Sequence, residues 1–216
     1  MIPDSFDDSA ISDNGNNTDP NEIELAPDIK NIVLEVYSPV NDTFTGVAMD
    51  LFVFCLGKDG KLTNDDFIAF YNNPVLFESN DHDKEYFIYR GEELEFPLYY
   101  DAYHLCLNSV PLEISQIVFI WILYDARTRR QDLGQCKYVR IRLGNDDCFE
   151  VAGLRQTEQE KKTTLFQKDI SKPLTNATAI NLAQLERTNI GWRFCFNDTP
   201  MSMGIADICE TYGMIL

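Results

Sequence analysis

Short runs of β-branched and aromatic residues, separated by turn-forming residues, make up most of the chain after residue 28. Runs of this kind predict β-strands. We expect strands at 32–37, 47–56, 67–71, 84–89, 94–99, 117–124, 138–143, 148–154, 177–185 and 192–196. About ten short strands with turns between them are typical of an all-β fold, a two-sheet antiparallel β-sandwich.

Two of the expected strands are apolar on both faces. The run 117–124 contains apolar residues only, and 47–56 is interrupted by a single charge, Asp50. A strand with one face in water alternates apolar and polar residues, so these runs predict central, fully buried strands. The turn Gly57-Lys-Asp-Gly60 then allows 67–71 to return as the hairpin partner of 47–56.

One stretch near the end of the chain has the period of a helix. Apolar residues recur there at i, i+3, i+4 and i+7, at Ile205, Ile208, Cys209 and Tyr212. Ser202 can cap this helix and Gly213 can end it, which predicts a short C-terminal helix. The polar segment 155–164 is expected to be a solvated loop or a short surface helix.

The first 28 residues differ from the rest in composition. They hold eight acidic residues, no Lys or Arg, and few large apolar side chains. Such a segment buries too little surface to offset the entropy lost on ordering. We therefore expect a disordered acidic tail at 1–28 and one sandwich domain at 29–216; an acidic interaction arm is the alternative for the tail.

Charge and cysteine usage narrow the class of protein. The 35 acidic and 18 basic residues give a net charge of −17, which repels nucleic acid as a direct partner. No basic and apolar secretion signal is present, and no apolar run approaches the roughly 20 residues of a membrane-spanning helix. The six cysteines form no CxxC pair, so we expect free thiols, a cytoplasmic location and no insertion into membranes.

Catalytic motifs are missing from the sequence. There is no GxGxxG, GxxxxGK[ST] or GxSxG pattern, and His82 and His104 belong to no HExxH motif. An EF-hand loop would place Cys55 and Gly57 at its first and third ligand positions, which excludes it. We predict that the protein is not an enzyme; a hydrolase or redox enzyme would need a thiol or imidazole beside a positioned base.

Oxygen-bearing side chains remain as candidate ligands. Asp50 lies in an apolar strand, where a carboxylate without a partner is costly and a cation would compensate it. Asp65 and Asp66 point to opposite sides of an extended segment, Asp65 on the side of Asn73 and Asp66 on the side of Asn72. Calcium needs six to eight oxygen ligands, usually including carboxylates. Spacing alone, however, favours turn formation by Asp65 and by the Asn72-Asn73 pair.

Several segments, taken in order, resemble the TerD family of bacterial tellurium-resistance and general stress proteins. They are Asp50-Leu-Phe-Val-Phe-Cys-Leu-Gly57, Asp65-Asp66-Phe-Ile-Ala-Phe-Tyr-Asn72-Asn73, Tyr124-Asp125-Ala126 with Gln131-Asp-Leu-Gly134-Gln135, Gly191-Trp192-Arg193-Phe194 and the final helix. The resemblance extends from about residue 29 to the C-terminus. It implies a calcium-binding β-sandwich without established catalysis.

The resemblance also implies a set of metal ligands. These would be Asp50, Asp65, Asp66, Asn72, Asn73, Glu92 and Glu93. The chain departs from the family pattern at Ala48, where the family has a carboxylate, and at Arg90, which brings a positive charge to the loop of Glu92 and Glu93. One or both family sites can therefore be lost. Asp81 and Asp83 offer replacement carboxylates, or belong to an ordinary solvated loop.

Two functions follow from these observations. The first is a calcium-binding, cytoplasmic stress protein associated with tellurium (tellurite) resistance. The second is a metal-free interaction module of the same fold that scaffolds other tellurium-resistance or stress proteins. The arrangement of oxygens around Asp50 distinguishes the two.

Overall fold

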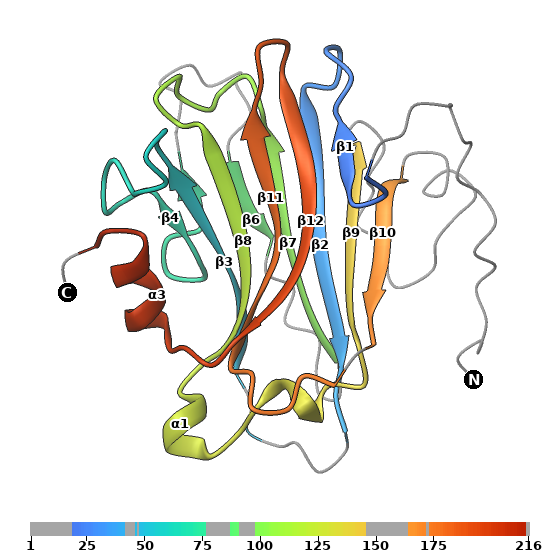
Figure 1. Ribbon diagram of the computed structural model, residues 1–216, viewed down its shortest axis with the longest axis vertical. Helices are drawn as coiled ribbons and strands as arrows, with labels where there is room; N and C mark the ends of the chain where they lie inside the picture. Colours follow the sequence, from blue (N-terminus) through green and yellow to red (C-terminus); the bar gives the residue numbers. More distant parts are fainter. Residues whose placement is uncertain are drawn as a thin grey trace.

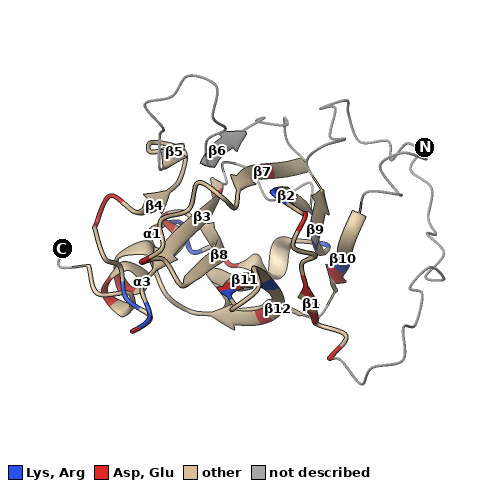
Figure 2. Cartoon of the chain, turned by 90° about the horizontal axis from the view of Figure 1, so that it is seen from above, with Lys and Arg blue, Asp and Glu red and all other residues tan. Residues whose placement is uncertain are grey.

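The computed structural model describes residues 19–41, 46, 48–76, 87–90, 98–145, 164–171 and 173–214, with the backbone alone at 75 and 87–90. Two antiparallel six-stranded sheets pack face to face, so the prediction of an all-β sandwich is confirmed (Figure 1). The two layers are seen edge-on from above (Figure 2).

The two sheets are built as follows. Sheet A contains, in spatial order, β1 (Glu22–Glu24), β12 (Trp192–Met201), β11 (Ala179–Arg187), β8 (Gln116–Leu123), β3 (Met49–Leu56) and β4 (Ile68–Ala69). Sheet B contains β10 (Thr164–Ile170), β9 (Val139–Asn145), β2 (Asn31–Pro39), β7 (Leu98–Cys106), β6 (Phe87–Arg90) and β5 (Val75–Leu76). The expected hairpin partner of β3 is confirmed, because β4 pairs with it through Val53↔Ala69 and Phe54↔Ile68.

The central strand β8 is buried on both faces, as its sequence predicts. Ile117, Phe119, Trp121 and Leu123 face sheet B in the main core. Val118, Ile120 and Ile122 face outward into a second apolar cluster. The helix α3 (Ile205–Thr211) contributes Ile208 and Cys209 to this cluster, which explains why β8 shows no polar alternation.

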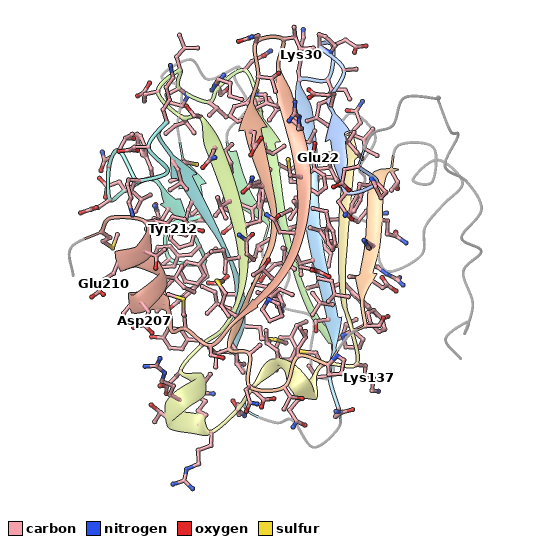
Figure 3. The ribbon with its side chains drawn as sticks, in the orientation of Figure 1. Glu22, Lys30, Lys137, Asp207, Glu210 and Tyr212 are labelled. Carbon is pink, nitrogen blue, oxygen red and sulfur yellow. The ribbon has the colours of Figure 1, made fainter. Side chains whose placement is uncertain are left out.

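The C-terminal helix is confirmed, but its predicted cap is wrong. Gly204 is the N-cap residue, and its N–H donates to the Asp207 carboxylate at 3.0 Å. Ser202 instead donates its hydroxyl to the carbonyl of Asn176 at 2.7 Å. Tyr212 lies on the side of α3 that faces sheet A, with its ring centroid 4.9 Å from that of Phe54 (Figure 3). The helix therefore covers the outer face of sheet A.

The predicted disordered tail is wrong for its last part. Residues 1–18 lie outside the described residues, but Glu22–Glu24 forms β1 against β12, with Ile23 opposite Phe194. The Leu25 N–H donates to the carbonyl of Trp192 at 2.9 Å, and the Leu25 side chain is buried. The ordered sandwich therefore begins before residue 29, because β12 provides a pairing edge that composition does not reveal.

Other elements differ from the expected ones. The strand β10 was not predicted and starts at the end of the expected polar segment 155–164, whereas the expected strand 148–154 lies outside the described residues. Two short helical turns were also not predicted, α1 (Ala126–Arg129) and the 3-10 turn η1 (Leu133–Gln135). In the described part of the chain, no helix is long and apolar enough to cross a membrane.

Candidate metal centre

Asp50 is the second residue of β3 and is only 7% exposed. Its Oδ2 accepts a hydrogen bond from the Tyr71 N–H at 3.4 Å. Its Oδ1 is buried and has no hydrogen-bond partner among the described residues. A carboxylate oxygen without a partner is costly away from water, so this atom calls for a compensating group.

Asp50 lies just beyond the end of the pairing between β3 and β4. The pairs are Phe54↔Ile68 and Val53↔Ala69, so β3 has no partner in β4 before Val53. Beyond it, carboxylates bind two backbone amides. Asp101 Oδ2 accepts from the Leu51 N–H at 3.0 Å, and Asp50 accepts from Tyr71. The two carboxylates thus accept hydrogen bonds from backbone amides that β3–β4 pairing leaves without a partner.

Asp101 was missed by the sequence analysis. It lies on β7 in the opposite sheet, is 4% exposed, and shares the inward face with the core residues Tyr103 and Leu105. Its carboxylate therefore reaches β3 across the sandwich. An acid in a strand of aromatic and apolar residues is the same signal that identified Asp50, and it could have identified Asp101.

Backbone amides and burial act on the Asp50 pKa in opposite directions. The Leu51 N–H that Asp101 binds also acts on Asp50, because hydrogen bonds from the Tyr71 and Leu51 amides lower the Asp50 pKa. Burial has the larger, opposite effect and raises the Asp50 pKa from 3.8 to about 6. None of the ion pairs within the described ranges includes Asp50. At neutral pH, Asp50 is thus a buried anion that no basic side chain of the described residues pairs with.

The predicted ligands of the β4–β5 region have other contacts. The Asn73 side-chain amide donates to the carbonyls of Asp66 at 3.2 Å and Ile68 at 2.8 Å, and so closes the turn. Asn72 is exposed at the same turn. These bonds agree with the turn-forming alternative for the Asn pair.

Asp65 and Asp66 are both exposed. The charge of Asp65 raises the pKa of Cys209, so Asp65 lies toward α3 on the outer side of sheet A. In the part of the chain that the structure describes, no group of three or more His, Cys, Asp or Glu side chains could hold a metal ion. Asp65 and Asp66 therefore do not join Asp50 and Asp101 in a larger group of metal ligands.

The remaining predicted ligands, Glu92 and Glu93, lie outside the described residues. The strand β6 ends at Arg90, whose backbone is paired with Ala102, the neighbour of Asp101. At the position where the family has a carboxylate, Ala48 offers only its carbonyl, which accepts from the Tyr124 N–H at 2.7 Å.

These residues fit a calcium ion in part. They supply two buried carboxylates, one of them with an open oxygen, whereas calcium takes six to eight oxygens. Backbone carbonyls, water or residues outside the described ranges would have to supply the others.

Burial disfavours the thiolate form of four cysteines in the described part of the chain. Burial raises the pKa of both Cys136 and Cys195 to about 11, and burial also raises the pKa values of Cys55 and Cys209. These thiols stay protonated at neutral pH and are poor nucleophiles.

The fold and the site at Asp50 and Asp101 define a class of protein. It is a two-sheet β-sandwich with two buried carboxylates, one on each sheet. The chain belongs to the TerD domain family, whose family model matches residues 15–212.

Similar proteins share both sequence and fold. The tellurium resistance protein TerD of Serratia marcescens is 26% identical over 193 residues, covering 88% of this chain and 91% of that protein. General stress protein 16U of Bacillus subtilis is 26% identical over 171 residues, covering 77% of each. The crystal structure of a homologue of the telluride resistance protein from Streptomyces coelicolor superposes with a TM-score of 0.53 at 9% identity, covering 84% of this chain and 95% of that one.

Proposed function

We propose that this chain is a non-catalytic, calcium-binding stress protein that acts in the cytoplasm in resistance to tellurium (tellurite). Membership of the TerD domain family supports the proposal, as do the names of its relatives, a tellurium resistance protein and a general stress protein. The raised pKa values of Cys136 and Cys195 support a role for these residues other than nucleophilic catalysis.

The observation that carries the calcium proposal is the buried Oδ1 of Asp50, which has no hydrogen-bond partner among the described residues. A bound cation would satisfy this oxygen and neutralise a charge that burial disfavours. Asp101 would add a second carboxylate from the opposite sheet, so that the ion would join β3 to β7. Calcium suits such a site better than magnesium, because it tolerates irregular coordination and more ligands.

Thermal unfolding of metal-stripped protein tests the calcium proposal. At 100 times its dissociation constant, calcium should stabilise the protein by roughly 2.7 kcal/mol. Magnesium at the same concentration should do much less. Asp50→Asn should abolish most of the effect, whereas Asp59→Asn, in the exposed β3–β4 turn, should preserve it.

The stress function needs a test in cells. A tellurite-sensitive bacterial host that expresses the wild-type chain should grow at higher tellurite concentrations than a host that expresses none. Asp50→Asn should reduce this protection, with Asp59→Asn as the matched control. Equal growth of the wild-type and empty hosts would contradict a role in tellurium resistance.

A metal-free interaction module for other tellurium-resistance proteins is the second candidate. It is favoured by the hydrogen bonds of Asp50 and Asp101 to the Tyr71 and Leu51 amides, which give both acids a structural role without metal. In that case calcium would leave the unfolding temperature unchanged, while the wild-type chain would still protect cells.

A further inference from the structure

Sulfur-bearing side chains gather around the C-terminal helix. Three of the chain's five methionines pack against the apolar cluster between α3 and the outer face of sheet A. Met201 ends β12, Met203 comes just before α3, and Met214 comes just after it. Cys209, on α3 itself, is buried in the same cluster. The helix is therefore flanked by methionines at both of its ends.

The helix α3 has little stability of its own. It is seven residues long, and only Ile208 and Cys209 are buried in it. Isolated helices shorter than about 12 to 15 residues are marginal in water, because nucleation is costly and few hydrogen bonds offset it. The helix is therefore formed only while its packing against sheet A supports it, and a loss of that packing should unfold it.

Contacts from β3 and from the β3–β4 connection hold the C-terminal end of the helix. The Tyr212 and Phe54 ring centroids are 4.9 Å apart (Figure 3). The Lys61 ammonium group donates to the carbonyl of Thr211 at 2.6 Å, and the Leu62 N–H donates to the carbonyl of Tyr212 at 2.8 Å. These contacts involve the very end of the chain, so they depend on the helix staying in place.

The N-terminal end of the helix is held through the methionine backbone. The carbonyl of Met201 accepts from the Thr178 N–H at 2.8 Å, and the carbonyl of Met203 accepts from the Thr178 hydroxyl at 2.7 Å. These bonds fix both methionines beside the apolar cluster. The ion pair between Arg127 and Asp207 is largely exposed, so it contributes little. Apolar packing is therefore the main attachment of α3.

The three methionine sulfurs can react with a peroxide. Met201, Met203 and Met214 are only partly buried, which leaves them accessible to a small oxidant. The thioether sulfur takes one oxygen atom from the peroxide: an S–O bond forms, the O–O bond breaks, and the remaining oxygen leaves with the protons as water. The sulfur loses two electrons and the peroxide gains them. The sulfoxide that results is polar and disrupts apolar packing.

The Cys209 thiol is a poorer target for the same oxidant. Burial, and to a smaller extent the charge of Asp65, raises the pKa of Cys209. The thiol therefore stays protonated at neutral pH, and a protonated thiol reacts slowly. The thioethers are thus the sulfurs around α3 on which oxidation should act.

We propose that Met201, Met203 and Met214 form an oxidation site that controls the attachment of α3, so that their conversion to sulfoxides by a peroxide releases the helix from sheet A. Release would uncover the apolar outer face of β3 and β8, which includes Phe54 and Ile120. Methionine sulfoxide reductases return the sulfoxide to the thioether, which makes the change reversible. This site needs no metal and is independent of the proposed calcium function.

Met49 provides a matched control within the same chain. It is also partly buried, but it packs against the main core between the sheets, and its backbone is paired with Leu123 of β8. Its oxidation should therefore leave α3 in place. Met49→Leu keeps the side-chain volume nearly constant, as does Leu at the other three positions.

Hydrogen exchange of the full chain, before and after hydrogen peroxide, tests the proposal. Peptide mapping should find sulfoxides at Met201, Met203 and Met214, and the α3 amides should then exchange at least about tenfold faster, while those of β8 stay unchanged. Met49→Leu should respond as the wild type does. The triple variant with Leu at the three α3 methionines keeps Cys209 and should show no acceleration.

Sulfoxide reductase should restore the slow exchange of α3 in the wild type. Unchanged α3 exchange in protein that carries all three sulfoxides would overturn the proposal, as would equal acceleration in the triple variant. Single Leu variants, each expected to remove part of the acceleration, repeat the test if the triple variant alters α3 before peroxide is added. A full wild-type response in all three single variants would also contradict the proposal.

Discussion

Two carboxylates with little exposed surface, Glu35 and Asp50, have different partners in two regions of this molecule. In sheet B, Glu35 is paired with Arg142, with side chains only 12% and 14% exposed, and it also accepts from the Tyr100 hydroxyl at 2.8 Å. At the end of the β3–β4 ladder, Asp50 is 7% exposed and accepts a hydrogen bond from the Tyr71 backbone amide, and none of the ion pairs of the described residues includes it. Among the side chains that the structure describes, the fold thus supplies a guanidinium to Glu35 and none to Asp50.

The difference has an energetic meaning. A buried carboxylate beside a guanidinium has its charge compensated, whereas one that lacks a counter-charge is destabilising unless it is protonated or binds a cation. The structural acids of sheet B need nothing further. Asp50 lacks such a partner among the described residues, and this contrast supports the proposal that it binds calcium.

Truncation of a core aromatic residue should give the largest loss of stability, against which the effects at Asp50 and Glu35 can be compared. Trp121 is fully buried on the inner face of β8, directly opposite Leu51 of β3. Trp121→Ala should lower the free energy of unfolding by about 3 to 5 kcal/mol, as expected for a core aromatic residue. Denaturant unfolding at several pH values should give the same loss throughout. A near-wild-type stability would show that β8 is not the centre of the core.

Asp50→Asn should change the free energy of unfolding in a way that depends on pH. The Asp50 pKa is about 6 in the folded protein and 3.8 ordinarily. The wild-type free energy of unfolding is therefore highest below about pH 4, where Asp50 is protonated, and falls as the pH rises through 6 and the buried carboxyl ionises. The variant keeps an acceptor for Tyr71 and removes the buried charge. Without calcium at pH 7, the variant should be more stable than the wild type by about 3 kcal/mol, an order-of-magnitude figure from the rise in the Asp50 pKa from 3.8 to about 6.

The gap between wild type and Asp50→Asn should close between pH 6 and pH 4, as measured by denaturant unfolding. A variant that is less stable than the wild type at pH 7 without metal would mean that Asp50 is compensated within the apo protein.

Glu35→Gln should give a smaller effect of opposite sign. The change leaves Arg142 without its charged partner, and should cost roughly 1 to 2 kcal/mol. Calcium should not alter this loss, because the acid already has its cation. A calcium-dependent loss in urea unfolding would show that sheet B, too, takes part in metal binding.

Sequence reasoning succeeded where local pattern and burial agree. The strands β3 and β8 were predicted because both of their faces are buried, and α3 because its apolar residues follow the helical period. It missed β10, whose burial does not alternate, and β1, which is three residues long and forms only because β12 offers an edge. Those two strands depend on tertiary contacts.

The candidate site was predictable from the sequence only in part. Asp50 was identified by its charge in an apolar strand, and the same rule applies to Asp101 on β7. That Asp101 of β7 binds the amide of Leu51, the residue after Asp50 on β3, depends on packing between the sheets, which no spacing along one strand reveals.

Calorimetric titration of metal-stripped protein with calcium tests the central claim most directly. The account predicts measurable binding by the wild type, binding at least about tenfold weaker in Asp50→Asn and Asp101→Asn, and unchanged binding in the exposed-site control Asp59→Asn. No binding heat and no shift in unfolding temperature for the wild type at millimolar calcium would contradict it. Equal affinity in the wild type and Asp50→Asn would contradict it as well.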